Sequence, residues 1–232
     1  MSGLEHAALF SAVIILLPLY FFIWWEHKDL QRKMTRLSLF GCIIGPVAAW
    51  WYLGDYLRSG FDMGVFGFFM DLLVAFLLIG VTSVTVNVLL HKRSKNTDHE
   101  GERSRYVLAF VLVFGTLLVL TELFEFSSLL SSALGLLVVA LFIWNERRDL
   151  MPYSFVGGGA LLVFGLIAYM GVKVFLPAFD NYESWDIVPV APNVTLPLKE
   201  WFWLFSWGLV GSVLYEWRHG YHFVSRHGEA SS

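Results

Sequence analysis

The chain has 232 residues, of which 57% are apolar and 15% charged, and its formal net charge is -3. Together with a mean hydropathy of +0.63, this composition excludes an ordinary soluble globular domain and indicates a membrane protein. Nothing in the charge distribution favours a nucleic-acid partner. The predicted fold class is therefore an all-α, polytopic membrane helical bundle.

About 20 consecutive apolar residues cross the hydrocarbon core of a bilayer as a helix. The chain contains seven stretches of this kind, roughly 7–25, 37–57, 64–90, 106–123, 128–144, 153–176 and 197–217. Glu122, Glu125 and the nearby serines mark the turn between the fourth and fifth stretches. If that turn stays within the membrane, the number of spans falls to six or five.

An internal duplication organises these spans. Residues 22–30, FIWWEHKDL, correspond to residues 142–150, FIWNERRDL, and an ungapped alignment of the last span in each half sets Asp71 against Glu200 and Asn87 against Glu216. Each half then has three spans, and the remaining span connects them if both copies face the same way. We predict a three-helix repeat over 1–95, a linker and connecting helix over 96–127, and a second, parallel repeat over 128–232.

The basic residues predict the orientation. Thirteen of the 16 Lys and Arg residues follow the first, third, fifth or seventh span. Cytoplasmic loops carry an excess of Lys and Arg, so this bias places the N-terminus outside and the C-terminus in the cytoplasm. We expect a multi-pass protein of the cell membrane.

Two acidic residues within the predicted spans are candidate catalytic groups. Asp71 lies about two turns into the third span, and Glu200 lies one turn into the seventh, after Pro197. Acids in a membrane face the bundle interior by default. Two neighbouring carboxyls in apolar surroundings share one proton, which keeps one of them neutral at pH 7. The alternative is a solvated Glu200 that only favours the helix dipole.

Other polar side chains in the spans are predicted to be structural. Glu216 lies sixteen residues beyond Glu200, which is about 24 Å along a helix. Glu216 is therefore expected at the cytoplasmic face, within reach of Arg147, Arg148 or Arg218. Hydrogen bonds between helices are expected for the polar residues of the third span, which are Thr82, Ser83, Thr85 and Asn87.

Aromatic side chains accompany the acids. Trp201, Trp203 and Trp207 follow Glu200, and an interfacial belt explains the first two of them. The functional alternative is that their aromatic faces stabilise a carbocation near the acid, and Trp207 is too deep for the belt. The candidate substrate-binding residues are Pro197, Trp201, Trp203, Trp207, Trp51, Tyr52 and Asp55.

No metal site or cofactor is predicted. The seven histidines all fall at span ends or in loops, without the spacing of metal ligands. The single cysteine, Cys42, is expected to be a small packing residue. Gly157, Gly158 and Gly159 open the sixth span, and small residues there favour close helix packing.

The segment Pro197-Leu198-Lys199-Glu200-Trp201-Phe202-Trp203 resembles the lycopene cyclase domain, the small membrane domain of heterodimeric or fused carotenoid cyclases. That family has paired three-span units, each with a Pro-x-Glu-Glu motif and aromatics at the head of its third span. Pro197 and Glu200 match the motif proline and its second acid, whereas Lys199 stands at the first acid. The corresponding segment 67–71 has no proline and a single acid, Asp71.

The resemblance implies an acid-catalysed, redox-neutral cyclisation of a carotenoid or other isoprenoid end group, with Glu200 and Asp71 as catalytic residues and no cofactor. The alternatives are a non-catalytic membrane protein of the same fold that binds carotenoid or lipid, and a small transporter. The expected partners are membrane lipid and a carotenoid or other isoprenoid. A homo-oligomer and a hetero-oligomer are both open alternatives.

Overall fold

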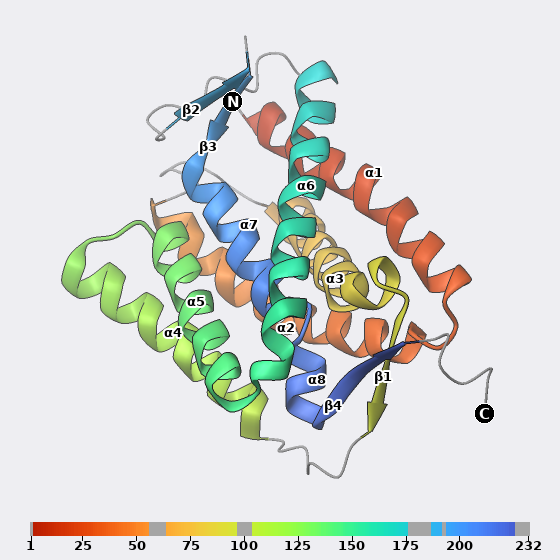
Figure 1. Ribbon diagram of the computed structural model, residues 1–232. Helices are drawn as coiled ribbons and strands as arrows, with labels where there is room; N and C mark the ends of the chain where they lie inside the picture. Colours follow the sequence, from red (N-terminus) through yellow and green to blue (C-terminus); the bar gives the residue numbers. More distant parts are fainter. Residues whose placement is uncertain (1, 56–63, 97–103, 176–186, 192–193, 226–232) are drawn as a thin grey trace.

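The computed structural model describes residues 2–55, 64–96, 104–175, 187–191 and 194–225, with only the backbone described at the ends of some elements. Long helices dominate it, and two short two-stranded sheets lie toward opposite ends of the bundle (Figure 1). In chain order the elements are α1 (Ser2–Glu26), α2 (Gln31–Asp55), α3 (Gly64–Leu89), β1 (Lys92–Asn96), α4 (Ser104–Phe124), α5 (Ser128–Glu146), the 3-10 turn η1 (Arg148–Leu150), α6 (Met151–Phe175), β2 (Ile187–Ala191), β3 (Val194–Pro197), α7 (Leu198–Gly211), α8 (Leu214–His219) and β4 (Tyr221–Ser225).

Four helices in the described part of the chain are long and apolar enough to cross a membrane. They cover Phe68–Leu89, Ser104–Phe124, Ser128–Glu146 and Arg148–Ala168, and Ala12–Glu26 is a shorter apolar helix. The predicted helical fold is confirmed, and the length and composition of these helices are consistent with the predicted membrane protein. Seven crossings stay a prediction. Side chains in parts of the first, second, third and sixth predicted spans lie outside the described part of the chain, and the seventh is divided between α7 and α8.

The last predicted span differs from the expectation because it is broken. Helix α7 ends at Gly211, and α8 begins at Leu214 after Val213 takes a non-helical backbone conformation with φ −123° and ψ −6°. A side chain at position 211 would lie 2.9 Å from a methyl carbon of Thr82 on α3. Glycine thus permits the close approach of α3 and α7 just before the break, which sequence periodicity does not reveal.

The two sheets were also absent from the predicted all-α fold. Strands β1 and β4 pair antiparallel, with Ser94 opposite Phe223 at the centre and Lys92 opposite Ser225 at one end. Strands β2 and β3 form the second antiparallel pair. Because β1 directly follows α3 and β4 directly follows α8, their pairing ties together two chain segments that are far apart in sequence.

Positions that the sequence alignment pairs between the two halves have similar local geometry. The Leu30 amide donates to the carbonyl oxygen three residues earlier at 2.9 Å, and the Leu150 amide does the same at 3.0 Å. The residues just before β1 and β4, His91 and Gly220, both have positive φ, 50° and 69°. In both halves the third helix packs extensively on the two helices before it (Figure 1).

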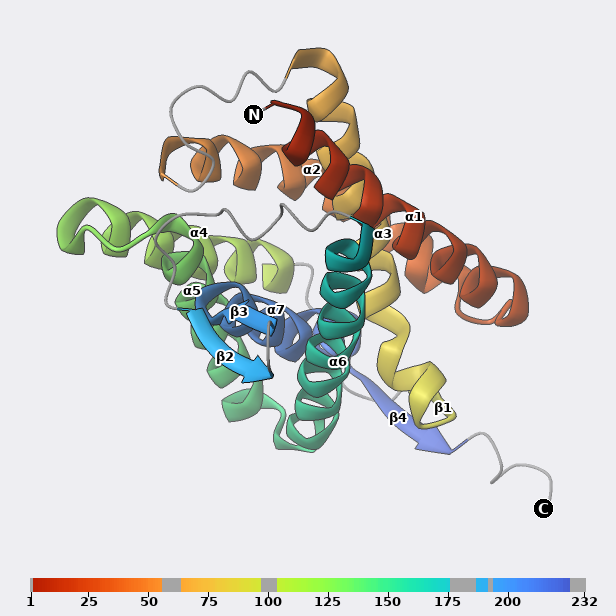
Figure 2. The same ribbon diagram turned by 90° about the horizontal axis from the view of Figure 1, so that it is seen from above.

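The buried core divides between the halves. One cluster lies among α1, α2 and α3 and includes Met34, Leu77 and Val84. The other is built mainly from α5, α7 and α8 and includes Ile143 and Trp217. Helix α4 projects on the side of the bundle opposite α1 (Figure 2). Only 11% of its apolar stretch is buried inside the protein. Apolar side chains so exposed suit a helix that faces lipid.

The expected close packing at the start of α6 is confirmed for two of the three glycines. A Cβ on Gly208 of α7 would lie 2.6 Å from the carbonyl oxygen of Gly157 and 2.7 Å from the Cα of Gly158. Helices packed this closely in a membrane need small residues at the contact. A Cβ on Gly159 would meet nothing within 4 Å, so this glycine has no part in the contact.

We predict that Gly208→Ala destabilises the protein by about 1–3 kcal/mol, because the added methyl group forces the two backbones apart. The matched control is Gly159→Ala, which is expected to be neutral or stabilising by about 0.5–1 kcal/mol because it improves helix propensity without a clash. Thermal unfolding in one detergent measures both. Equal effects of the two substitutions would contradict the packing assignment.

Candidate functional site

The predicted acid at the head of α7 lies at a strand-to-helix junction. Strand β3 ends at Pro197 and α7 begins at Leu198, which places Glu200 in the first helical turn. Lys199 and Glu200 are both half-buried. A carboxylate in the first turn of a helix interacts favourably with the N-terminal end of the helix dipole. This geometry is compatible with both of the roles predicted for Glu200.

Two tryptophans extend the same face of α7 inward. Glu200, Trp203 and Trp207 are spaced three and four residues apart, so they share one side of the helix. The rings of Trp203 and Trp207 stack with their centroids 6.2 Å apart and 12° between their planes. Trp207 packs against the buried cluster of Leu37 and Ile79. This face of α7 therefore turns toward the bundle interior at its deeper end.

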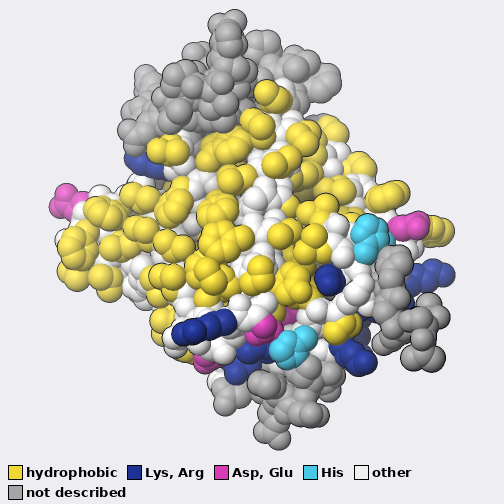
Figure 3. All heavy atoms as spheres, viewed as in Figure 1, with side chains coloured by type: hydrophobic (Ala, Val, Ile, Leu, Met, Phe, Trp, Pro, Cys, Tyr) yellow, Lys and Arg dark blue, Asp and Glu magenta, His cyan; other side chains and the backbone are white. Residues whose placement is uncertain are grey.

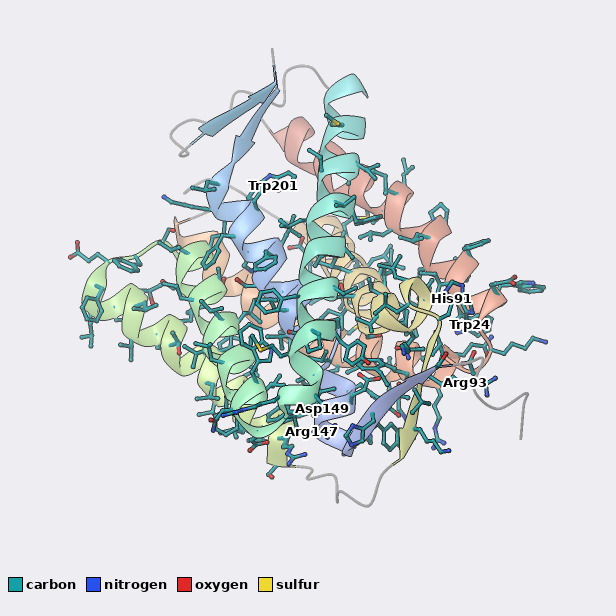
Figure 4. All side chains as sticks on the ribbon, viewed as in Figure 1. Trp24, His91, Arg93, Arg147, Asp149 and Trp201 are labelled. Atoms are coloured by element: carbon teal, nitrogen blue, oxygen red, sulfur yellow. The ribbon has the colours of Figure 1, made fainter. Side chains whose placement is uncertain are left out.

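The indole nitrogen of Trp207 is a buried donor without a hydrogen-bond partner. A buried polar group that makes no hydrogen bond is costly. Trp201, which is half-buried, lies at the upper end of α7 (Figure 4). The aromatic residues that follow Glu200 thus run from the end of the helix into the core.

The surroundings of the other predicted site residues are described only in part. Asp71 is half-buried in α3, and α3 contacts α7 deeper in the bundle, where Thr82 meets Gly211. A meeting of Asp71 with Glu200 stays a prediction. The side chains of four further predicted residues lie outside the described part of the chain, namely Pro197, Trp51, Tyr52 and Asp55.

A buried polar cluster lies at the other end of the bundle and was missed by sequence analysis. The Lys33 ammonium group, on α2, contacts Glu216 Oε1 at 2.5 Å and donates to Asn87 Oδ1 at 2.8 Å. The side chains of Lys33 and Glu216 are only 5% and 0% exposed. Ser94 of β1 donates to the same Glu216 oxygen at 2.5 Å, and the Asn87 amide donates to the Lys92 carbonyl oxygen at 3.2 Å. We call Lys33, Asn87, Ser94 and Glu216 the polar hub.

The polar hub corrects two predictions. Glu216 is structural, as expected, yet it pairs with Lys33 and not with one of the predicted arginines. Thr82, Ser83 and Thr85 do not bond between helices, because each donates to a carbonyl oxygen three or four residues earlier in α3, at 2.7, 2.7 and 3.0 Å. Lys33 sits in a run of basic residues that also contains Arg32 and Arg36, so no sequence signal distinguished it from a solvated charge.

Aromatic rings complete the surroundings of the Lys33 ammonium group. Its nitrogen lies 5.5 Å from the ring centre of Tyr215 and 5.6 Å from that of Phe223. A cation within about 6 Å of an aromatic face gains electrostatic stabilisation, which increases as the cation is desolvated. The Glu216 carboxylate oxygen, the Asn87 amide oxygen and the two rings therefore replace the water that Lys33 loses on burial.

We predict that Lys33→Met or Glu216→Leu alone destabilises the protein by about 3–5 kcal/mol, because each leaves the partner charge buried and unpaired. The double variant Lys33→Met/Glu216→Leu is expected to be more stable than either single variant, because no buried charge is left. The free energies of unfolding of the wild type, the two single variants and the double variant, measured under one set of conditions, complete this double-mutant cycle. Additive losses in the double variant would show that the two charges are not coupled.

A second ionic contact fastens β4 to the turn between α5 and α6. Arg147 donates from Nε and from Nη2 to the two carboxylate oxygens of Asp149, both at 2.8 Å, and from Nη2 to the Tyr221 carbonyl oxygen at 3.0 Å. His222 Nδ1 lies 2.7 Å from Asp149. Arg147 is buried, whereas its neighbour Arg148 is exposed, and Figure 4 shows Arg147 and Asp149 at the lower end of the bundle.

We predict that Arg147→Gln lowers the free energy of unfolding by about 1.5–3 kcal/mol, because hydrogen bonds to a charged partner are lost at a buried site. Arg148→Gln removes the same charge one residue later and is expected to change stability by less than about 0.5 kcal/mol. Chemical unfolding of both variants measures the difference. A comparable loss in Arg148→Gln would mean that net charge, and not this contact, is responsible.

Within the described part of the chain, no group of three or more His, Cys, Asp and Glu side chains is arranged to hold a metal ion. Comparisons with protein families, curated proteins and solved structures give no match for this chain. The described part of the chain is helical and contains four helices long and apolar enough to cross a membrane, which is consistent with a helical membrane protein.

Proposed function

We propose that the protein binds a linear carotenoid or a related isoprenoid beside the head of α7 and cyclises its end group without a redox change. The observation that carries this proposal is the face of α7 on which Glu200 is followed by the stacked rings of Trp203 and Trp207. An acid next to aromatic faces in an apolar bundle is suited to forming a carbocation and stabilising it.

In the proposed reaction, the carboxyl group of a neutral Glu200 gives its proton to the terminal double bond of the substrate. The neighbouring double bond then attacks the resulting cation and closes the ring, and a carboxylate takes up a proton from the ring. One proton enters and one leaves, so atoms and charge balance with no oxidant or reductant. Asp71, aligned with Glu200 between the two halves, is the second carboxyl in this scheme.

We further propose seven crossings in two parallel three-helix repeats, with α4 as the connecting helix. The equivalent hydrogen bonds at Leu30 and Leu150 support it. The register of β1 and β4 also supports it, because Ser94 and Phe223 are equivalent positions of the two halves and lie opposite each other. A two-fold axis between the halves would produce this symmetric register.

The proposed orientation, with the N-terminus outside and the C-terminus in the cytoplasm, rests on charge. Most of the Lys and Arg side chains seen in Figure 3 gather along the lower part of the face, beneath a broad apolar zone. Basic residues concentrate on the cytoplasmic side of membrane proteins. The end that carries β1 and β4 is accordingly proposed to face the cytoplasm.

Expression in a lycopene-accumulating host tests the enzymatic proposal. We expect conversion of lycopene to a ringed carotenoid, loss of this conversion in Glu200→Gln, and its retention in Glu122→Gln, which removes an exposed acid at the end of α4. Pigment chromatography and a membrane blot for each variant provide the measurement. Unchanged lycopene in the presence of the membrane-inserted wild-type protein would refute cyclisation of this substrate.

A second candidate is a non-catalytic protein of the same fold that binds carotenoid or lipid. It is favoured by Lys199, which places a cation directly before Glu200 where the resembled motif has an acid. Under this alternative the wild-type protein retains unmodified pigment or lipid through purification. Absorption spectra and lipid extraction of the purified protein distinguish this outcome from turnover.

A further inference from the structure

A group of basic and aromatic side chains beside the polar hub has no part in the proposed cyclisation. It is assembled from three helices and one strand, with Arg36 from α2, Tyr106 from α4, Tyr215, Arg218 and His219 from α8, and Tyr221 from β4. We call these six residues the basic aromatic cluster. Helix α8 and strand β4, which supply four of them, lie at the end of the bundle that also carries β1 (Figure 1).

Contacts within the cluster fix the position of the Arg218 guanidinium group. Its Cζ lies 5.0 Å from the ring centre of Tyr106, and its Nη1 contacts Nε2 of His219. The other ring nitrogen of His219, Nδ1, lies 2.9 Å from the Tyr215 carbonyl oxygen. These contacts fit a neutral imidazole that donates from Nδ1 and accepts from Arg218 at Nε2.

Burial is the largest cause that lowers the pKa of His219, and the positive charges of Arg218 and Arg36 lower it further. A neutral His219 therefore orients Arg218 without adding a third positive charge. Leu37, the residue after Arg36, packs in one cluster with Tyr106, Tyr215 and Tyr221, which brings Arg36 to the side of α8 that carries Arg218. The cluster thus concentrates two permanent positive charges.

Aromatic rings form a packed support beneath these charges. The rings of Tyr215 and His219 are 4.0 Å apart, and Tyr221 lies 5.4 Å from His219 and 5.8 Å from Tyr215. Arg36 precedes Leu37, which packs with Tyr215 in one buried cluster. Packed rings restrict the arginine side chains, so less conformational entropy is lost when they bind a ligand.

The charges of the cluster have no carboxylate counterpart in the described part of the chain. Neither Arg36 nor Arg218 takes part in the ion pairs found among the described residues, which include those of Lys33, Arg105, Arg147 and His222. The acid whose charge reaches His219 is Glu216, and Lys33 already engages it at 2.5 Å. Arg218 Nε is also buried without a hydrogen-bond partner. An anion would supply the missing acceptor.

We propose that the basic aromatic cluster binds the phosphate group of an anionic phospholipid. Guanidinium groups form paired hydrogen bonds with phosphate oxygens, and the tyrosine hydroxyls are further donors. Basic pockets between helices at the cytoplasmic surface are suited to anionic headgroups, and the apolar face of α4 beside Tyr106 can accept the acyl chains. This inference does not depend on the proposed cyclisation.

Native mass spectrometry of the full chain in neutral detergent tests the proposal, with phosphatidylglycerol and phosphatidylcholine of identical acyl chains as probes. We expect the wild-type protein to prefer phosphatidylglycerol, and Arg36→Gln and Arg218→Gln each to weaken its binding about fivefold. The matched control is Arg32→Gln, an exposed arginine one turn before Arg36 on α2, which is expected to leave the preference unchanged. Arg36 is exposed, so Arg36→Gln is not expected to disturb folding. If Arg218→Gln does not fold, the binding measured for Arg36→Gln decides the test.

Competition with inorganic phosphate identifies the source of the phosphate group. If millimolar phosphate displaces phosphatidylglycerol and its effect requires Arg36, the site recognises phosphate and the free anion is its ligand. If phosphate has no effect while the Arg36-dependent preference persists, the phospholipid is the ligand. Equal binding of the two lipids, or an equal loss in Arg32→Gln, would overturn the site.

Discussion

The burial of one ammonium group constrains much of this structure. Lys33 can leave water only if a carboxylate, further acceptors and aromatic faces surround it, because an unpaired buried charge is very costly. Its partners come from α3 and α8, and Ser94 of β1 joins them. Satisfying Lys33 therefore requires α2, α3, α8 and β1 to meet at one point, which joins residues from both halves of the chain.

The non-helical backbone around the polar hub also needs polar partners. The break between α7 and α8 precedes Glu216 by only a few residues, and the pairing of β1 with β4 covers this end of the bundle. In a membrane protein, backbone outside helices is tolerated where its polar groups are satisfied by protein. The irregular segments are thus concentrated where polar partners exist, while the apolar middle stays helical.

The candidate site at the head of α7 was predictable from the sequence, whereas the polar hub was not. Glu200 and its tryptophans were recognisable because an acid beside aromatics inside an apolar stretch is rare. The polar hub was not, because Lys33 is one of several basic residues in its segment and its partner is 183 positions away. Asn87 and Glu216 were already aligned as equivalent positions, but the alignment did not indicate that both would contact one lysine.

Sequence alone determined the class of this protein: apolar stretches of membrane-spanning length, the turns between them, and glycines where α6 meets α7. These properties follow from local composition and helical spacing. Tertiary structure decided which charge is buried, where α7 stops, how β1 and β4 pair, and which aromatic ring lies against Arg218. Each of these depends on contacts between segments far apart in the chain, and hydropathy carries no information about such contacts.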